Sequence, residues 1–224
     1  MSKFETMLAL CVLAATVLVG CKQPSGLAGN DVHIASTETT YCFVANDTNL
    51  TGYVSKYMDG QTPNGWYTMT PGSIIERGLE EVGGYVYPKT YGYCVFEVPE
   101  FESPAEVLVC TLYYKQKEHV GSLNLVFNWL SGISSWTPTA GVLWNAIDTS
   151  SYALAPAQGV QADGWCKLAL SGQGCAWLED YANSGGGSFP TGWKFSVGIA
   201  GWYTRVWGVT DDAVAPYMKV VYSQ

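Results

Sequence analysis

From residue 37 onward, apolar residues recur at every second position in short runs that turn residues separate. A period of two is typical of β-strands that bury one face. The runs cover residues 91–98, 106–115, 122–130, 193–202 and 216–224. The run 106–115 is apolar at nearly every position, which predicts a strand buried on both faces. We therefore expect an all-β fold, an antiparallel jelly-roll-like β-sandwich with eight or more strands.

One later segment departs from this pattern. The stretch CAWLEDYANSGGG at 175–187 has apolar residues at helical spacing before it reaches three glycines. This predicts one short helix near 176–182. Composition fits a β-rich fold, because the chain holds 15 Tyr, 9 Trp and 25 Gly with only 13% charged residues. The net charge of −8 comes without a basic stripe, so we expect no nucleic-acid partner.

The N-terminal region contains an apolar run at residues 7–19, followed by Gly20 and Cys21. The run is shorter than the roughly 20 residues that span a bilayer, and it has the length of a signal-peptide core. The segment Leu18-Val19-Gly20-Cys21 resembles the bacterial lipobox, in which the cysteine thiol receives a diacylglyceryl group and the chain is cut before that cysteine. An ordinary secretory signal with a chance cysteine is the alternative.

The lipobox resemblance implies where each part of the chain belongs. Residues 1–20 would be a lipoprotein signal peptide, and residues 21–36 a lipidated N-terminus and flexible tether. Residues 37–224 would form the β-sandwich domain. Lipid on Cys21 would make the membrane a partner, and would anchor the exported protein to the outer face of a bacterial membrane or the cell surface.

Five cysteines remain beyond the leader and Cys21. An oxidising compartment permits disulfides, and an odd number leaves at least one thiol unpaired or paired between chains. Cys166 and Cys175 flank a short segment and are the candidate disulfide pair. Cys94 and Cys110 lie within strand-like runs, where buried free thiols are the alternative.

Catalytic signals are sparse, so we expect a non-enzymatic protein. The motifs G-x-S-x-G and H-E-x-x-H are absent from the sequence, and His119 lies in a turn-like stretch where we expect it to be exposed. Carboxylates cluster at 80–81, 100–106, 179–180 and 211–212, where a glycosidase pair could form in three dimensions. Asp211 and Asp212 offer the oxygen ligands of a structural calcium ion; no other cofactor is expected.

Aromatic residues supply the candidate ligand-binding side chains, because sugar rings stack their apolar faces on Trp and Tyr. The alternative is that these large rings fill the core. The candidates occur at turn-like positions, and the run 202–207 follows a predicted strand. They are Trp66, Tyr67, Trp136, Trp202, Tyr203, Arg205 and Trp207.

Several short motifs resemble the DNRLRE-type domains of bacterial extracellular proteins, which are related to carbohydrate-binding modules. The resembling stretches span roughly residues 40–224, although the eponymous DNRLRE string is absent. They are Tyr91–Pro99, Glu106–Tyr114, Leu143-Trp144-Asn145, Trp165–Leu170, Ala176-Trp177-Leu178 and Pro216–Tyr222. The resemblance implies a surface or secreted sandwich module, often attached to glycan-active proteins.

Three functions follow from these features. The first is a lipid-anchored, non-catalytic module that binds carbohydrate, which an exposed aromatic strip beside polar residues would favour. The second is a structural or adhesive surface subunit that binds protein or itself, which a flat apolar patch or an unpaired edge strand would favour. The third is a small glycan hydrolase or lyase, which would need two facing carboxylates about 5–10 Å apart.

Overall fold

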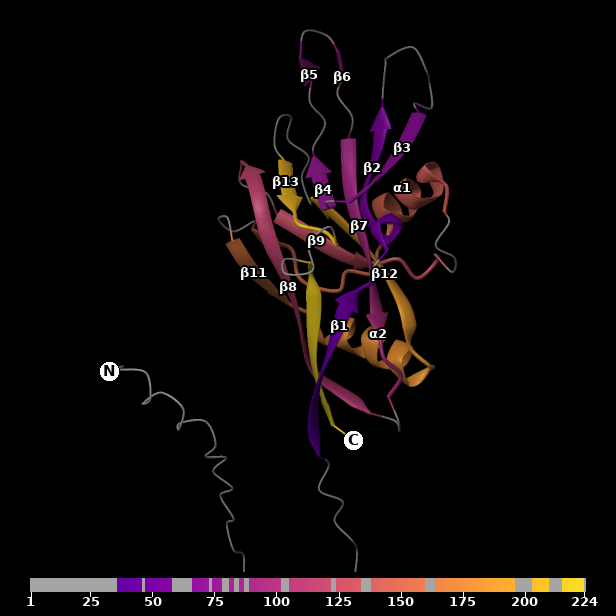
Figure 1. Cartoon of the computed structure of the whole chain (residues 1–224), viewed down its shortest axis with the longest axis vertical. Coiled ribbons are helices and arrows are strands. Elements are labelled where there is room, and N and C mark those ends of the chain that lie inside the picture. The colour runs from indigo at the N-terminus through magenta and orange to yellow at the C-terminus, as the bar shows by residue number, and fades with distance from the viewer. Residues whose placement is uncertain are drawn as a thin grey trace, which may run out of the picture. The chain divides into compact units, whose positions relative to one another are not determined.

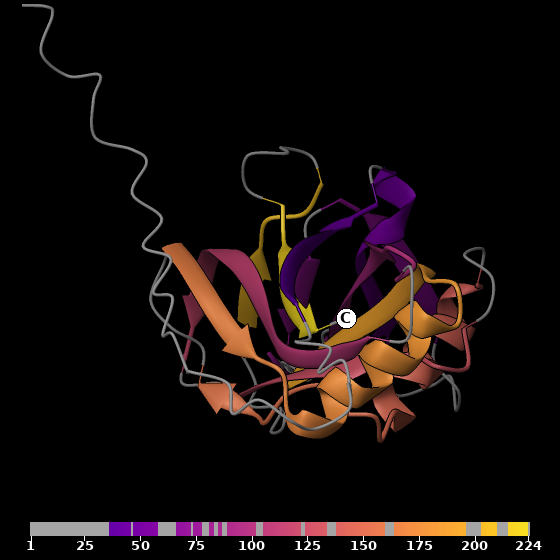
Figure 2. The same cartoon turned by 90° about the horizontal axis from the view of Figure 1, so that it is seen from below.

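Twelve of the fourteen strands that the structure describes pair into one large antiparallel sheet that curls back on itself, and the other two pair with each other (Figures 1 and 2). The structure is a computed structural model. It describes residues 36–45, 47–57, 66–72, 74–77, 81–82, 85–86, 89–101, 105–121, 124–133, 138–159, 164–195, 203–209 and 215–223, and of residues 48, 75–77, 81–82, 85–86, 158–159, 195 and 203 it describes the backbone alone. All of these residues belong to the unit Ala35–Gln224.

The described residues form fourteen strands, two α-helices and one short 3-10 helix. The strands are β1 (Thr37–Val44), β2 (Thr51–Tyr57), β3 (Trp66–Pro71), β4 (Ile74–Arg77), β5 (Glu81–Val82), β6 (Tyr85–Val86), β7 (Lys89–Val98), β8 (Glu106–Val120), β9 (Asn124–Trp129), β10 (Gln158–Gly159), β11 (Gly164–Ala169), β12 (Gly187–Phe195), β13 (Tyr203–Val206) and β14 (Tyr217–Ser223). The helices are η1 (Thr48–Leu50), α1 (Ala140–Thr149) and α2 (Gly172–Asn183). The expected all-β sandwich with a short helix near 176–182 is confirmed.

The two long strands β7 and β8 organise the sheet. β8 pairs with β14 and β13 and also with β11, while β7 pairs with β2, β1, β12 and β4. β1 joins the two halves because it pairs with β14 along its length and with β7 at its end. The layers therefore face each other across a shared interior, as Figure 2 shows.

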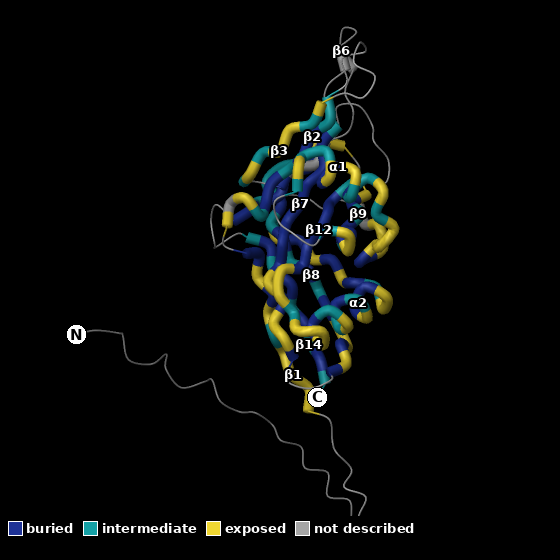
Figure 3. The backbone as a smooth tube through the Cα atoms, turned by 90° about the vertical axis from the view of Figure 1, so that its right-hand side faces the viewer, coloured by how far each residue is buried: buried dark blue, intermediate teal, exposed yellow. Residues whose placement is uncertain are grey.

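The main core lies between these layers and is closed on one side by α2. Alternation directs side chains inward: on β14, Met218, Val220 and Tyr222 are buried while their neighbours are half-buried. Leu178 and Ala182 of α2 join the same core. In Figure 3 the dark blue of buried residues runs through β7, β8 and β12. Apolar burial of this kind is the dominant driving force for folding.

A serine cap marks the start of helix α2, and a glycine follows its C-terminal end. The Ser171 hydroxyl caps its N-terminus by accepting a hydrogen bond from the Gly174 N–H at 3.0 Å. Its C-terminal turn passes into Gly186, which has a φ of 63° and approaches the Val98 carbonyl so closely that a Cβ would lie 2.4 Å from it. Only glycine fits both the left-handed conformation and that contact. Within the described part of the chain, neither α1 nor α2 is long and apolar enough to cross a bilayer.

Helix α1 was not expected, and it builds a second core. Its buried Leu143, Trp144 and Ile147 pack on the face of β7 that points away from the main core. Tyr91 and Tyr93 of β7 lie on that face. β7 is consequently buried on both sides, between the main core and the layer under α1.

Strand β8 departs from its prediction. The expected burial on both faces of 106–115 is wrong, because Leu108 and Val109 are exposed and only one face contributes to the core. The physical reason is that no described element covers the other face of β8, whereas α1 covers the corresponding face of β7. His119, expected in a turn, lies within this strand opposite Thr204 and is half-buried.

Candidate functional site

Five aromatic rings gather on the outer face of four neighbouring strands, a face that no described element covers. β1, β14, β8 and β11 lie side by side in this order of pairing. Their register places Phe43, Tyr217 and Tyr113 opposite one another in a single row across the sheet. We name the group the aromatic strip; its members are Tyr41, Phe43, Tyr113, Trp165 and Tyr217.

Tyr217 is the centre of the aromatic strip. Its ring stacks on Tyr113 with 4.9 Å between centroids and an interplanar angle of 9°. Its centroid lies 6.1 Å from that of Tyr41, 6.2 Å from that of Phe43 and 6.0 Å from that of Trp165. Such spacings are typical of favourable ring pairs. The mutual contacts hold the rings as one continuous surface before any ligand arrives.

The strip is open to solvent. Phe43 is 61% exposed, Trp165 51% and Tyr41 46%, and the remaining two rings are half-buried. In Figure 3 much of β1 is coloured as exposed. Desolvation first, and then the neighbouring hydroxyls of Tyr113 and Tyr41, raise the pKa of Tyr217, which keeps this phenol protonated. Contiguous exposed aromatics on a single protein commonly mark a binding surface.

Lysines lie among these rings at cross-strand positions. Lys219 of β14 is opposite Tyr41, and Lys167 of β11 is opposite Tyr113. Lys115 of β8 is opposite Trp165. Directly opposite residues on antiparallel strands share a face. The site thus combines flat apolar surfaces with cationic donors.

Part of the predicted 202–207 run adjoins the strip. The Trp207 N–H donates to the Lys115 carbonyl at 3.1 Å, and the Lys117 ammonium lies 4.1 Å from the Trp207 ring centroid. Arg205 forms an ion pair with Glu118 at 3.4 Å, so it braces β13 on β8. The side chain of Tyr203, like Trp202 and Trp136 as a whole, lies outside the described residues.

The other predicted pair, Trp66 and Tyr67, is split between the two faces of β3. Trp66 is 47% exposed and stacks on Tyr57 with 5.1 Å between centroids. Tyr67 instead packs on Trp144 of α1, with 5.8 Å between centroids. Adjacent strand residues point to opposite faces, so these two cannot share one binding surface. Neither one contacts a ring of the aromatic strip.

The layer under α1 contains similar residues in a closed setting. The Lys56 ammonium lies 4.9 Å from the ring centroid of Trp144, which is only 6% exposed. Lys89 forms an ion pair with Asp148 at 3.4 Å, and the Tyr91 hydroxyl also donates to that carboxylate.

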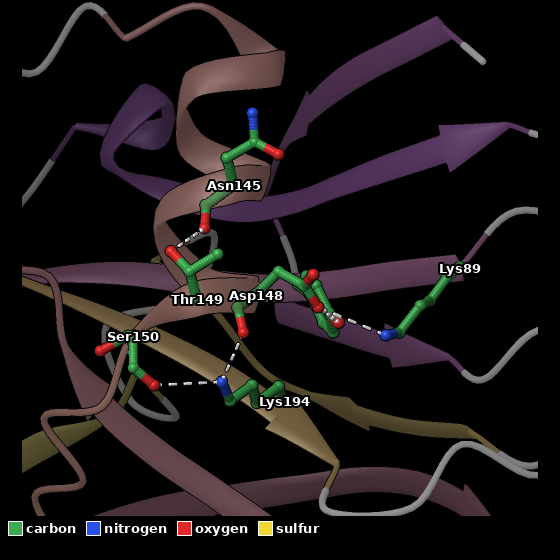
Figure 4. A network of polar contacts seen from close by, with 7 residues as sticks. Lys89, Asn145, Asp148, Thr149, Ser150 and Lys194 are labelled. Atoms are coloured by element: carbon green, nitrogen blue, oxygen red, sulfur yellow. Dashed lines mark hydrogen bonds and ion pairs between the residues drawn. The ribbon is translucent and has the colours of Figure 1, made fainter. Parts of the chain in front are cut away.

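Figure 4 shows how this network continues at the end of α1. There the Lys194 ammonium donates to the carbonyls of Asp148 at 2.9 Å and Ser150 at 3.2 Å. A lysine at a helix C-terminus satisfies free carbonyls and the helix dipole.

A cleft of about 460 Å³ opens near both helices. Trp129, Tyr181 and Pro190 supply much of its wall, together with Leu130, Ser131, Ile133 and Ser188. These lining residues include neither a carboxylate nor a histidine. Its aromatic rings belong to the packing of α2 on β9 and β12, where Trp129 stacks on Phe189 at 5.5 Å.

The predicted Cys166–Cys175 disulfide is not formed. Both thiols are buried and outside any disulfide, as are Cys42, Cys94 and Cys110. Cys166 lies on β11, whereas Cys175 lies on α2. The extended chain covers about 13 Å between Cys166 and Leu170, before α2 begins. Disulfides need Cα atoms within about 7 Å. The alternative of buried free thiols for Cys94 and Cys110 is confirmed, and burial raises the pKa of Cys94 to about 12.

One member of the predicted carboxylate clusters, Glu179, has a role in the fold. Glu179 of α2 accepts a hydrogen bond from the Val107 N–H at 2.7 Å, which ties this helix to β8. Among the described side chains, no group of three or more His, Cys, Asp or Glu is placed to hold a metal ion. The calcium candidates Asp211 and Asp212 lie outside the described residues, as does Cys21.

Sequence reasoning missed all five rings of the aromatic strip. A signal existed in TETTYCFV, where Tyr41 and Phe43 flank a buried Cys42 at a period of two. The same alternation sets Tyr217 apart from Met218. Which of these outward rings meet depends on strand pairing between segments far apart in the chain, which no local pattern specifies.

Comparison with known proteins adds no name to this site. No protein-family model matches the chain, and no curated protein matches it. The resemblances to the lipobox and to DNRLRE-type domains stay predictions.

Proposed function

We propose that this chain is a lipid-anchored bacterial surface protein whose sandwich domain is a non-catalytic carbohydrate-binding module. The observation that carries the proposal is the aromatic strip, centred on Tyr217, on a sheet face that no described element covers. Strands lie about 4.8 Å apart, so four of them offer a platform roughly 14 Å wide. That width suits several sugar rings bound in a row.

The physical basis is stacking between rigid surfaces. Tyr and Trp supply large amphipathic contact areas at a low cost in side-chain entropy. The ring contacts around Tyr217 reduce that cost further, because the rings already support each other in the free protein. A binding role without chemistry is supported by Glu179, which is engaged with the backbone of β8.

The anchor in this proposal rests on the sequence. Cys21 would be the lipidated residue, and the segment up to residue 36 would tether the domain to the membrane surface. Two acyl chains are needed for stable anchoring, and a diacylglyceryl group provides them. Mass spectrometry of the membrane-extracted protein tests this part: a Cys21→Ser variant is expected to lose the lipid-modified N-terminal peptide.

Binding is tested with the full-length chain in a mild detergent, on a glycan array and on insoluble polysaccharides. Trp165→Ala and Tyr217→Ala are expected to abolish retention while leaving the protein folded. Trp66→Ala is the matched control, because Trp66 is about as exposed as Trp165 but lies away from the strip. Retention that depends on Trp66 instead, or no retention by any glycan, would contradict the proposed site.

A structural or adhesive subunit is the second candidate. Leu108 and Val109 are exposed on β8 beside the strip, and β11 pairs only with β8 among the described strands. Apolar residues and an open edge favour protein contacts. Sedimentation of the full-length chain distinguishes the two: concentration-dependent association that Leu108→Lys disrupts would favour the second candidate.

A further inference from the structure

Lysines lie beside several aromatic rings of the proposed binding face. Three of the five rings have a lysine directly opposite them on the neighbouring strand. The pairs are Tyr41 with Lys219, Tyr113 with Lys167 and Trp165 with Lys115. Cβ atoms of such pairs lie about 5 Å apart, so each lysine side chain begins beside its ring and shares its face.

The pattern continues along β8 past the aromatic strip. Lys117 places its ammonium 4.1 Å from the ring centroid of Trp207. The Trp207 backbone in turn donates to the carbonyl of Lys115, which lies opposite Trp165. Trp207, like three rings of the aromatic strip, therefore has a lysine beside it.

Among the described residues, few carboxylates on this face could neutralise these lysines. One is Glu97 of β7, which lies opposite Phe43 and accepts a hydrogen bond from the Ser188 hydroxyl at 3.0 Å. The sequences of β14 and β11 contain no Asp or Glu. Glu38 of β1 accepts a hydrogen bond from the hydroxyl of Tyr222, a residue of the core. Glu118 pairs with Arg205, and Glu106 lies at the first residue of β8. Among its described residues, lysines outnumber unpaired carboxylates on this face, although the chain has a net charge of −8.

We infer that the ligand is an acidic polysaccharide whose sugar rings carry carboxylates, a conclusion that rests on the proposed carbohydrate-binding function. A uronic acid keeps the apolar ring face that stacks on Tyr or Trp. Its carboxylate projects from the edge of the sugar ring, where a lysine beside the protein ring meets it. A lysine ammonium is a compact point charge on a flexible stem, so it follows small shifts of the sugar.

The test compares two forms of one polymer, polygalacturonate and the same polymer with its carboxylates methyl-esterified. Binding to the full-length chain is measured by affinity electrophoresis in mild detergent at two salt concentrations, about 0.05 M and about 0.5 M. The higher concentration screens exposed charges. The variants are Lys167→Gln with Lys219→Gln, and Trp165→Ala. Lys56→Gln is the control, because Lys56 lies over Trp144 under α1.

The inference predicts that polygalacturonate binds at low salt and that its methyl ester binds more weakly. The double lysine variant should lose about fivefold to tenfold in affinity for polygalacturonate and little for the ester, as expected for two exposed charge pairs. Lys56→Gln should lose nothing. Trp165→Ala should lose affinity for both polymers.

Two results separate this inference from the function on which it rests. Equal binding of both polymer forms, lost in Trp165→Ala, would overturn the acidic ligand and keep the carbohydrate module. Retention of neutral glycans without retention of polygalacturonate would likewise overturn the acidic ligand and keep the carbohydrate module. Polygalacturonate binding that is insensitive to the lysine variants would also overturn the acidic-ligand inference. Failure to bind any glycan would instead contradict the proposed function itself.

Discussion

Two outer faces of this domain contain the same kinds of side chain and differ in what lies over them. On β2, β3 and β7, Tyr67 and Tyr91 accompany Lys56 and Lys89, and helix α1 covers them with Trp144. On β1, β14, β8 and β11, the aromatic strip and its lysines are covered by no described element. Aromatic rings beside lysines are therefore not a binding signature by themselves.

The difference lies in the partners that each set has already found. Under α1, Lys89 and Tyr91 both reach Asp148, and the ring of Trp144 is buried. On the open face, Trp165 and Phe43 keep half or more of their surface in water. The side chains covered by α1 stabilise the fold, whereas the exposed side chains of the aromatic strip are available to contact a ligand.

The largest expected contrast comes from removing one tryptophan on each face. Trp144→Ala should lower the free energy of unfolding by about 3–5 kcal/mol, because it leaves a cavity in a buried layer. Trp165→Ala should change it by less than about 1 kcal/mol, since exposed side chains contribute little. Urea denaturation measures both. Similar losses from the two variants would remove the distinction between the faces.

The two faces of a single strand should also differ at alkaline pH. Burial raises the pKa of Cys42, between outward Tyr41 and Phe43, from its ordinary 9.0 to about 12. The folded state therefore holds the thiol proton more tightly than the unfolded chain, so stability is full below pH 9 and is lost as pH rises towards 12. Urea denaturation from neutral to alkaline pH should show this decline, and Cys42→Ala should make it less steep. An unchanged slope would contradict the inward placement of Cys42.

A smaller effect is expected from the ion pair beside α1. Lys89 and Asp148 are each about one-third exposed, so solvent screens their attraction. Lys89→Met should therefore lower the free energy of unfolding by no more than about 1 kcal/mol. Glycan retention should not change. Loss of retention in this variant would place the binding face under α1 instead.

The smallest expected effect is that of a reducing agent. None of the five described cysteines is in a disulfide, so dithiothreitol should leave the midpoint of thermal unfolding unchanged. Alkylation of the denatured, unreduced protein should modify Cys42, Cys94, Cys110, Cys166 and Cys175. A midpoint that falls on reduction, or a protected Cys166–Cys175 peptide, would restore the disulfide expected from the sequence.

The sequence predicts the strands well because burial of one face imposes a local period. β7, β8, β9 and β14 all fall on predicted runs, and α2 on the predicted helix. Helix α1 left a similar signal in the spacing of Ala140, Leu143, Trp144 and Ile147, with Thr139 as its N-cap. Helix α1 was missed because it is short and lies in a sequence dominated by strand-like runs.

The binding face was not predictable in the same way. Tyr41, Tyr113, Trp165 and Tyr217 come from four strands, and only the pairing of those strands brings their rings together. The covering of Trp144 and the exposure of Trp165 likewise depend on where α1 packs. Burial of a particular tryptophan is a tertiary property, and the sequence pattern around it does not specify it.

The most direct test of the binding face follows the indole N–H signals of the two tryptophans during a titration. Full-length protein labelled with ¹⁵N would be titrated with oligogalacturonate, and with any neutral glycan that the array retains. Trp165→Phe and Trp144→Phe variants assign the two signals. The account predicts that the Trp165 signal shifts in proportion to occupancy and that the Trp144 signal stays. A bound glycan that leaves Trp165 unmoved, or that moves Trp144 instead, would contradict it.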